Sequence, residues 1–106
     1  MEIIIGNKLK KKCLNRDSII KNYGSMAGRV IRIIDTIGAS QNLHEVSKIN
    51  SYKFHQLAGN YEGCYAISIN GNYRMVVSPC NIDKPYELKN IKELEIVDIL
   101  DYHWRW

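Results

Sequence analysis

The sequence has few cysteines, few prolines and no long apolar run, and these shortages exclude several classes of protein. Its three cysteines, Cys13, Cys64 and Cys80, are odd in number and widely spaced, and no CxxC pair occurs. We therefore expect buried or neutral thiols in a reducing compartment, with no disulfide framework and no metal site. No apolar run approaches the roughly 20 residues that a membrane-spanning helix needs. Neither a cofactor nor a membrane partner is expected.

The first residues, MEIIIGNKLKKK, place an apolar block before the cations. A secretory signal has the reverse order, so we expect a cytoplasmic protein. The length of 106 residues suits one domain, residues 1–106, and is too short for two separate hydrophobic cores. Apolar residues make up 45% of the chain and charged residues 25%, as is typical of a globular domain with a real core.

Positive charge is in excess, with a net charge of +4. Such a balance favours an acidic partner, either nucleic acid or an acidic protein. Four lysines cluster on an expected helix over residues 8–15, and two arginines lie together off the apolar stripe of the next long helix. These candidate RNA- or ribosome-binding residues are Lys8, Lys10, Lys11, Lys12, Arg29 and Arg32. The usual interpretation of such a lysine cluster is a solvated helix face.

The first part of the chain predicts a short strand followed by helices. We expect a strand at residues 2–5, and a helical turn that is capped by Asp17 and ended by Gly24. The clearest helix covers about residues 25–37, with Ser25 as its N-cap and Gly38 as its stop. Another short helical turn is expected at 43–47. The long helix has one apolar stripe, made by Met26, Val30, Ile33, Ile34 and Ile37.

After Asn50 the apolar period changes from 3.6 to 2, which predicts strands. Residues 52–57 are a candidate strand, and clear alternation follows at 65–69 and 73–77. The NGN sequence at 70–72 predicts a hairpin turn, because asparagine and glycine tolerate positive φ. A long polar connection over 78–93 then leads to a final strand at 94–100.

The resulting order is β-α-α-β-β-β. Helices come first and a meander of strands follows, which predicts an α+β fold. We expect the N-terminal strand and two helices to pack with a mostly antiparallel, twisted sheet whose one face the helices cover.

The end of the chain, ILDYHWRW, places ionisable side chains on the last stretch of the final strand. Simple alternation puts Val97, Ile99, Asp101 and His103 on one face, and the residues between them on the other. A carboxylate next to an imidazole can orient the ring and favour its protonated form. A solvated strand end that only stops the sheet is the alternative.

Three other features have a structural as well as a functional interpretation. Arg74, on a middle strand, could bridge a carboxylate such as Asp101 or bind a phosphate with two hydrogen bonds. His55 is either inert or an acid–base residue. Trp104 and Trp106 either cover the sheet edge or stack on bases.

Taken together, one arginine, two histidines, one aspartate and one tyrosine on a small basic sheet protein are the groups that metal-free RNA cleavage needs. A base takes the proton from a 2′-hydroxyl, which attacks the adjacent phosphate. A cation stabilises the phosphorane, and an acid protonates the leaving 5′-oxygen.

The segments FHQLAGNYEGCYAISINGNYRMVV and IVDILDYHW resemble HigB-type killer toxins of the RelE/ParE toxin superfamily. That family typically has a His-Pro-Leu-Lys-Gly stretch, a strand, an Asn-Gly turn, an aromatic–Arg pair and a terminal Asp-Tyr-His. This chain has HQLAG, AISINGN, YR and DYH at those places. LKKKCLN and AGRVIRIIDTIGAS lie where the family has its two helices, so the resemblance covers about the whole chain.

The resemblance implies a small RelE/ParE-like fold and a type II toxin. Such a toxin is a ribosome-dependent endoribonuclease (an mRNA interferase) that cuts messenger RNA in the ribosomal A site and inhibits translation. It also implies neutralisation by a cognate helix-turn-helix, HigA-like antitoxin. The implied catalytic residues are His55, Asp101, Tyr102 and His103, with Arg74 holding phosphate.

The sequence departs from the family pattern at two residues and in one connection. Ala58 replaces the usual lysine, Gln56 replaces a proline, and the 78–93 connection is longer. Two alternatives therefore stay open. One is a poison without nuclease activity that inhibits gyrase, as the ParE branch does, and the other is a catalytically weakened relative.

Overall fold

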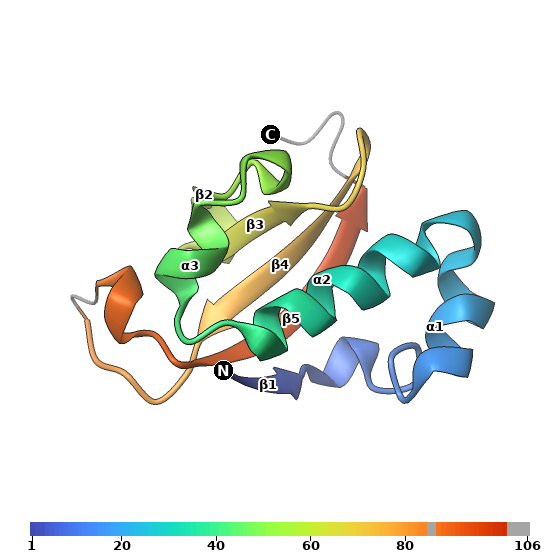
Figure 1. Ribbon diagram of the computed structural model, residues 1–106, viewed down its shortest axis with the longest axis horizontal. Helices are drawn as coiled ribbons and strands as arrows, with labels where there is room; N and C mark the ends of the chain where they lie inside the picture. Colours follow the sequence, from blue (N-terminus) through green and yellow to red (C-terminus); the bar gives the residue numbers. More distant parts are fainter. Residues whose placement is uncertain (85–86, 102–106) are drawn as a thin grey trace.

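The computed structural model describes residues 1–84 and 87–101 (Figure 1). The strands are β1 (Glu2–Ile5), β2 (His55–Gln56), β3 (Tyr65–Ser68), β4 (Tyr73–Pro79) and β5 (Glu93–Asp101). The α-helices are α1 (Arg16–Tyr23), α2 (Ala27–Ala39) and α3 (Leu43–Ser47). Short 3₁₀ turns are η1 (Asn7–Leu9), η2 (Gly24–Met26), η3 (Asn50–Tyr52), η4 (Gly59–Tyr61) and η5 (Leu88–Asn90).

The strands form one sheet in the order β1-β5-β4-β3-β2. β1 runs parallel to β5, and the other three pairs are antiparallel. The first and last strands of the chain are therefore neighbours, while the short β2 forms the opposite edge. The expected α+β architecture with a mostly antiparallel sheet is confirmed.

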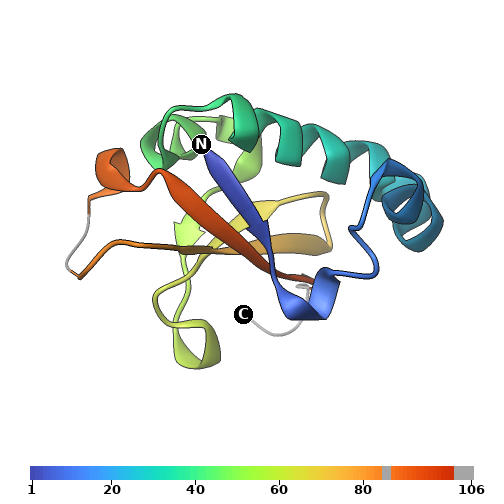
Figure 2. The same cartoon turned by 90° about the horizontal axis from the view of Figure 1, so that it is seen from below.

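The main core lies between the helices and one face of the sheet. Of the predicted stripe on α2, Val30, Ile33 and Ile37 are buried, and Met26 and Ile34 are partly buried. They pack with sheet residues that include Met75, Val77, Leu94 and Ile96. Figure 2 shows α2 running along this side of the sheet. The long amphipathic helix therefore decides which sheet face becomes the core.

A second, smaller cluster lies on the opposite face. Leu57, Ala66 and Val76 are buried there, and partly buried side chains of Tyr61, Cys64, Val97 and Leu100 pack against them. The η4 segment lies on this side, away from α2 (Figure 2). We call this surface the open face and define it by His55, Ala66, Arg74, Val76, Asp98 and Leu100.

A β-bulge in β5 shifts the alternation that the sequence predicts. Val76 pairs with Asp98 but the next residue, Val77, pairs with Ile96, so the register skips Val97. The expectation that Ile96 and Ile99 lie on opposite faces is therefore wrong, because an extra residue in one strand reverses the alternation beyond it. Ile96, Ile99 and Asp101 share the helix-covered face, and Asp98 and Leu100 share the open face.

The predicted helix over residues 8–15 is also wrong. The segment forms the η1 turn and one further turn, in which the Cys13 amide donates to the carbonyl of Leu9. Four lysines in five residues repel one another on a helix, and the segment's buried side chains are Leu9 and Cys13 alone. Asn15 then has an extended backbone and begins α1.

The helix ends differ from the predicted caps in several places. Asn15, not Asp17, is the N-cap of α1, and its side chain accepts the Ser18 amide at 2.9 Å. Ser25 lies in η2 and does not cap α2, which begins at Ala27 and continues past Gly38 to Ala39. Gly24 ends α1 as predicted, with φ of 51°.

Local backbone geometry also explains the short β2 and the hairpin. Lys53 has φ of 46°, which interrupts the candidate strand at 52–57 and leaves only His55–Gln56 paired. The NGN turn lies where predicted, but not through positive φ. Instead, Asn70 Oδ1 accepts the amides of Asn72 and Tyr73 at 2.9 and 2.8 Å.

Within the part of the chain that the structure describes, no helix combines the length and the apolar character needed to cross a membrane.

Gly6 fixes the approach of the N-terminal segment to β5, and we predict that Gly6→Ala destabilises the fold. Its amide donates to the Ile96 carbonyl at 2.8 Å, and a Cβ here would lie 2.8 Å from that same oxygen. A backbone carbonyl cannot move away as the end of a flexible side chain can, so the clash strains the fold. We expect the free energy of unfolding, measured by urea denaturation, to fall by about 1–3 kcal/mol.

Gly28→Ala is the matched control for this prediction. A Cβ at Gly28, in the first turn of α2, meets no atom within 4 Å. Alanine has the higher helix propensity, so stability should rise by about 0.5–1 kcal/mol. Equal effects of the two substitutions would contradict the assigned approach of Gly6 to β5.

Candidate active site on the open face

The open face is organised by one row of paired residues across four strands. His55 pairs with Ala66, Ala66 with Val76, and Val76 with Asp98. Directly paired residues project on the same side of a sheet, so His55 and Asp98 share this face at its two ends. Ala66 and Val76 between them are fully buried. The polar ends of the row therefore flank a short apolar floor.

Arg74 lies in the neighbouring row, opposite Leu100. Its Nη1 donates to the carbonyls of Asn70 and Tyr73 at 2.7 and 3.1 Å, and the residue is only 8% exposed. The carbonyl dipoles hold the guanidinium against the hairpin turn and offset part of its desolvation. The structure thus provides a cation of fixed position at the end of the central hairpin.

The strand register separates Arg74 from Asp101. Tyr73 pairs with Asp101, and Tyr73 packs against the helix-side core. The two side chains therefore leave the sheet on opposite faces, which does not favour the ion pair that the sequence suggested. Tyr102, His103, Trp104 and Trp106 lie outside the described residues.

His55 has an orienting contact with its own segment. Its Nδ1 is 2.9 Å from the carbonyl of Lys53. A carbonyl only accepts, so this contact assigns the proton to Nδ1, and Nε2 is the acceptor of the neutral ring. The left-handed backbone at Lys53, which shortened β2, also turns this carbonyl back toward the imidazole.

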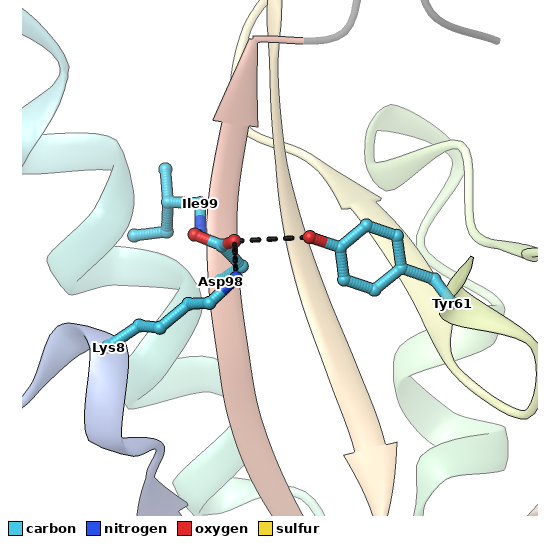
Figure 3. Close-up of polar contacts among 4 residues, drawn as sticks. All are labelled: Lys8, Tyr61, Asp98 and Ile99. Carbon is cyan, nitrogen blue, oxygen red and sulfur yellow. Dashed lines mark hydrogen bonds and ion pairs between the residues drawn. The ribbon is translucent and has the colours of Figure 1, made fainter.

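Asp98 joins three separate elements on the open face (Figure 3). Its Oδ2 accepts the Tyr61 hydroxyl at 3.2 Å and pairs with Lys8 Nζ at 3.4 Å, while Oδ1 accepts the Ile99 amide at 2.8 Å. Tyr61 comes from η4 and Lys8 from η1, on either side of β5. The carboxylate therefore ties two irregular segments to the end of the paired row.

Sequence reasoning missed Tyr61 and Asp98 as site residues. The available signal was an acidic residue inside the apolar run of the last strand, ELEIVDILD. A carboxylate there requires partners, but the bulge that aims it at the open face, and the loop that supplies Tyr61, are not visible in the alternation.

The predicted basic residues fall into two regions. Lys8 reaches the open face, whereas Lys10, Lys11 and Lys12 are exposed and form no ion pair with a residue that the structure describes. Arg29 and Arg32 lie on α2 and line a hollow with Ser51, Tyr52 and Ser68. Arg29 Nη1 donates there to the Ile69 carbonyl at 3.2 Å.

Of the three thiols, Cys13 is buried, and Cys64 and Cys80 are half-buried. Burial raises the pKa of Cys13 and Cys64, and hydrogen bonds from Tyr23 and Ser78 oppose the two shifts. Burial, followed by the charge of Glu95, raises the pKa of Cys80. Burial and the neighbouring Cys13 also raise the pKa of Tyr23. In the described part of the chain, no three His, Cys, Asp or Glu side chains are grouped so that they could bind a metal ion.

Comparison with known proteins gives a structural match without a sequence match. No protein-family model matches the chain, and no curated protein matches its sequence. The solved YoeB-YefM complex from Staphylococcus aureus contains a chain that superimposes with a TM-score of 0.55. The chain has the RelE-like fold of YoeB. This structural match covers 98% of both chains at 15% sequence identity. It therefore includes both the open face and the helices, but it establishes the fold alone.

We predict that the thiols react slowly in the folded protein. The thiolate is the reactive form, and the pKa values of all three cysteines lie above the ordinary 9.0. Reaction with a disulfide reagent at pH 7.5 should be severalfold slower than in urea, and should accelerate as the pH rises above 9.

The urea-unfolded protein is the control, because all three thiols then have ordinary pKa values. A thiol that reacts equally fast at pH 7.5 in both states would contradict the assigned burial.

Proposed function

We propose that the protein is the toxin of a type II toxin–antitoxin system and that it acts as a ribosome-dependent endoribonuclease of the HigB type. The observation that supports this most is that a RelE-like fold carries Arg74 and His55 on the sheet face that the helices leave open. The net charge of +4 agrees with an RNA partner. The motifs SINGNYR and DYH support the HigB type.

The proposed reaction is transesterification without a metal ion. A general base removes the proton of a 2′-hydroxyl, whose oxygen attacks the adjacent phosphorus. The P–O5′ bond breaks and a general acid protonates the leaving oxygen, which produces a 2′,3′-cyclic phosphate and a 5′-hydroxyl. The candidate acid and base residues are His55, Asp101 and His103. Of these, His55 shares the open face with Arg74, whereas the register turns Asp101 to the helix-covered face.

Arg74 is proposed to stabilise the phosphorane. Its anchoring to the carbonyls of Asn70 and Tyr73 fixes the cation before substrate arrives, so that little reorganisation accompanies charge development. An arginine keeps its positive charge when it is almost buried, which a lysine does less reliably.

The proposed partners are the ribosome with its messenger RNA and a helix-turn-helix, HigA-like antitoxin, in the cytoplasm. The solved relative was crystallised as a complex of YoeB with YefM. By analogy of fold, we expect the present chain to be neutralised by a small protein encoded next to it.

The function is tested by incubating the purified protein with ribosomes on a defined message and mapping cuts by primer extension. We expect cuts in the A site, and losses of about 10²–10⁴-fold in rate for His103→Ala, since one acid or base is removed. Arg74→Lys should also lose activity, because the bidentate fork is lost.

Arg16→Lys is the matched control for Arg74→Lys, because Arg16 makes an exposed ion pair with Asp35 on the helices. It should cut like the wild type. No A-site cuts, or equal cutting by His103→Ala, would contradict the proposal. Inhibition of gyrase supercoiling without RNA cleavage would favour the ParE-like alternative, and soluble expression without growth arrest would favour a weakened relative.

A further inference from the structure

Lys8 differs from the other lysines of the N-terminal segment in where the fold holds it. The Gly6 amide donates to the Ile96 carbonyl on one side of Lys8, and Leu9 is buried on the other. This anchoring points the Lys8 side chain across β5 to Asp98 (Figure 3). Lys10, Lys11 and Lys12 lie in the exposed turn that follows.

Asp98 does not need Lys8 to satisfy its carboxylate. The Ile99 amide and the Tyr61 hydroxyl already bind one oxygen each, at 2.8 and 3.2 Å. The Lys8 contact is the longest of the three at 3.4 Å, and the Lys8 side chain is 69% exposed, against 15% for Asp98. Exposed ion pairs stabilise a fold little, so the ammonium can leave without exposing an unsatisfied buried charge.

The position of Asp98 places Lys8 next to the anchored arginine. Asp98 is the diagonal neighbour of Arg74, which pairs with Leu100 two residues further along β5. Such diagonal neighbours are about 7–8 Å apart on one sheet face. Arg74 is fixed by two carbonyls, whereas Lys8 has a long, mobile stem. The open face thus has one fixed cation and, beside it, one that can move.

We propose that Lys8 binds a phosphodiester of single-stranded RNA on the open face, and that Asp98 is the positioning residue that holds its ammonium until RNA arrives. The inference rests on the proposed function and assigns the backbone contact next to Arg74. The RNA phosphate takes the place of the Asp98 carboxylate as the anionic partner of Lys8, and no covalent step is involved.

The experiment measures anisotropy of a fluorescein-labelled 2′-O-methyl oligoribonucleotide at several salt concentrations. The probe lacks the attacking hydroxyl, so binding is read without cleavage. We expect Lys8→Ala to weaken binding at least about tenfold, the lower end of the range for loss of a hydrogen bond to a charged group. The slope of log affinity against log salt should fall by about 0.7, the value for one phosphate contact on a single strand.

Lys21→Ala and Lys48→Ala are matched controls, because both lysines are exposed and belong to the helices, in the last turn of α1 and at the end of α3. Lys8→Arg tests rescue. The two controls should change affinity less than twofold, and Lys8→Arg should keep the wild-type slope. If Lys8→Ala matches these controls, or if the wild type does not bind the probe at low salt, the inference is overturned. A-site cleavage on ribosomes tests the proposed function separately, so the two can fail independently.

Asp98→Asn separates positioning from a merely structural role. The one oxygen of asparagine can still accept the Ile99 amide, and its Nδ2 can donate to the Tyr61 hydroxyl oxygen. Asparagine no longer attracts Lys8 or repels phosphate, so we expect probe binding to tighten about two- to fivefold. If Asp98 only stabilised the fold, its substitution would lower the melting temperature and leave the affinity for the probe unchanged or weaker. That result would overturn the assignment of Asp98.

Discussion

The antiparallel pairing of β4 with β5, with its bulge at Val97, is the constraint on which the other features depend. In an unbroken strand, Asp98 would follow Leu94 and Ile96 onto the face that α2 covers. A carboxylate among Val30, Ile33 and their neighbours would lose its hydration without gaining donors, which is costly. The bulge instead keeps Ile99 in the helix-side core and turns Asp98 to the open face. One extra residue thereby separates the main core from the polar surface.

Asp98 also contacts two irregular segments that lie outside the sheet. Residues 57–64 form an irregular segment between β2 and β3, with positive φ at Gly59 and Gly63. Its Tyr61 ring packs over the small cluster of Leu57, Ala66 and Val76, and its hydroxyl reaches Asp98. On the other side of β5, the N-terminal turn is fixed by the Gly6 amide and contributes Lys8. Two segments that are distant in sequence thus meet at one carboxylate, and this meeting gives the candidate site a defined shape.

The sequence predicted features that repeat, and missed those that depend on a single residue. The apolar period of α2 and the apolar alternation of the strands each extend over several positions, so the α+β fold could be inferred. The skip at Val97 and the left-handed Lys53 interrupt a repeat, and an alternation rule carries no information about them. For the candidate site, the sequence singled out His55, Arg74 and Lys8 by residue type. It could not find Tyr61 or Asp98, because their relation is made only when η4 and β5 meet in the fold.

The two cations of the open face differ in a way that bears on how the surface could recognise an anion. Arg74 is nearly buried and bound to carbonyls, so its charge has a fixed position and is weakly screened by salt. Lys8 is exposed, so the contribution that we propose for it depends on ionic strength and on the anions that compete for its ammonium. A fixed charge can define where a phosphate must be placed, but it cannot follow a flexible strand. A mobile charge can follow the strand, but left alone it would spend most of its time in solvent. Pairing the mobile cation with an already satisfied carboxylate keeps it near the fixed one, so an anion at Asp98 is compatible with the proposed binding of phosphate on this face.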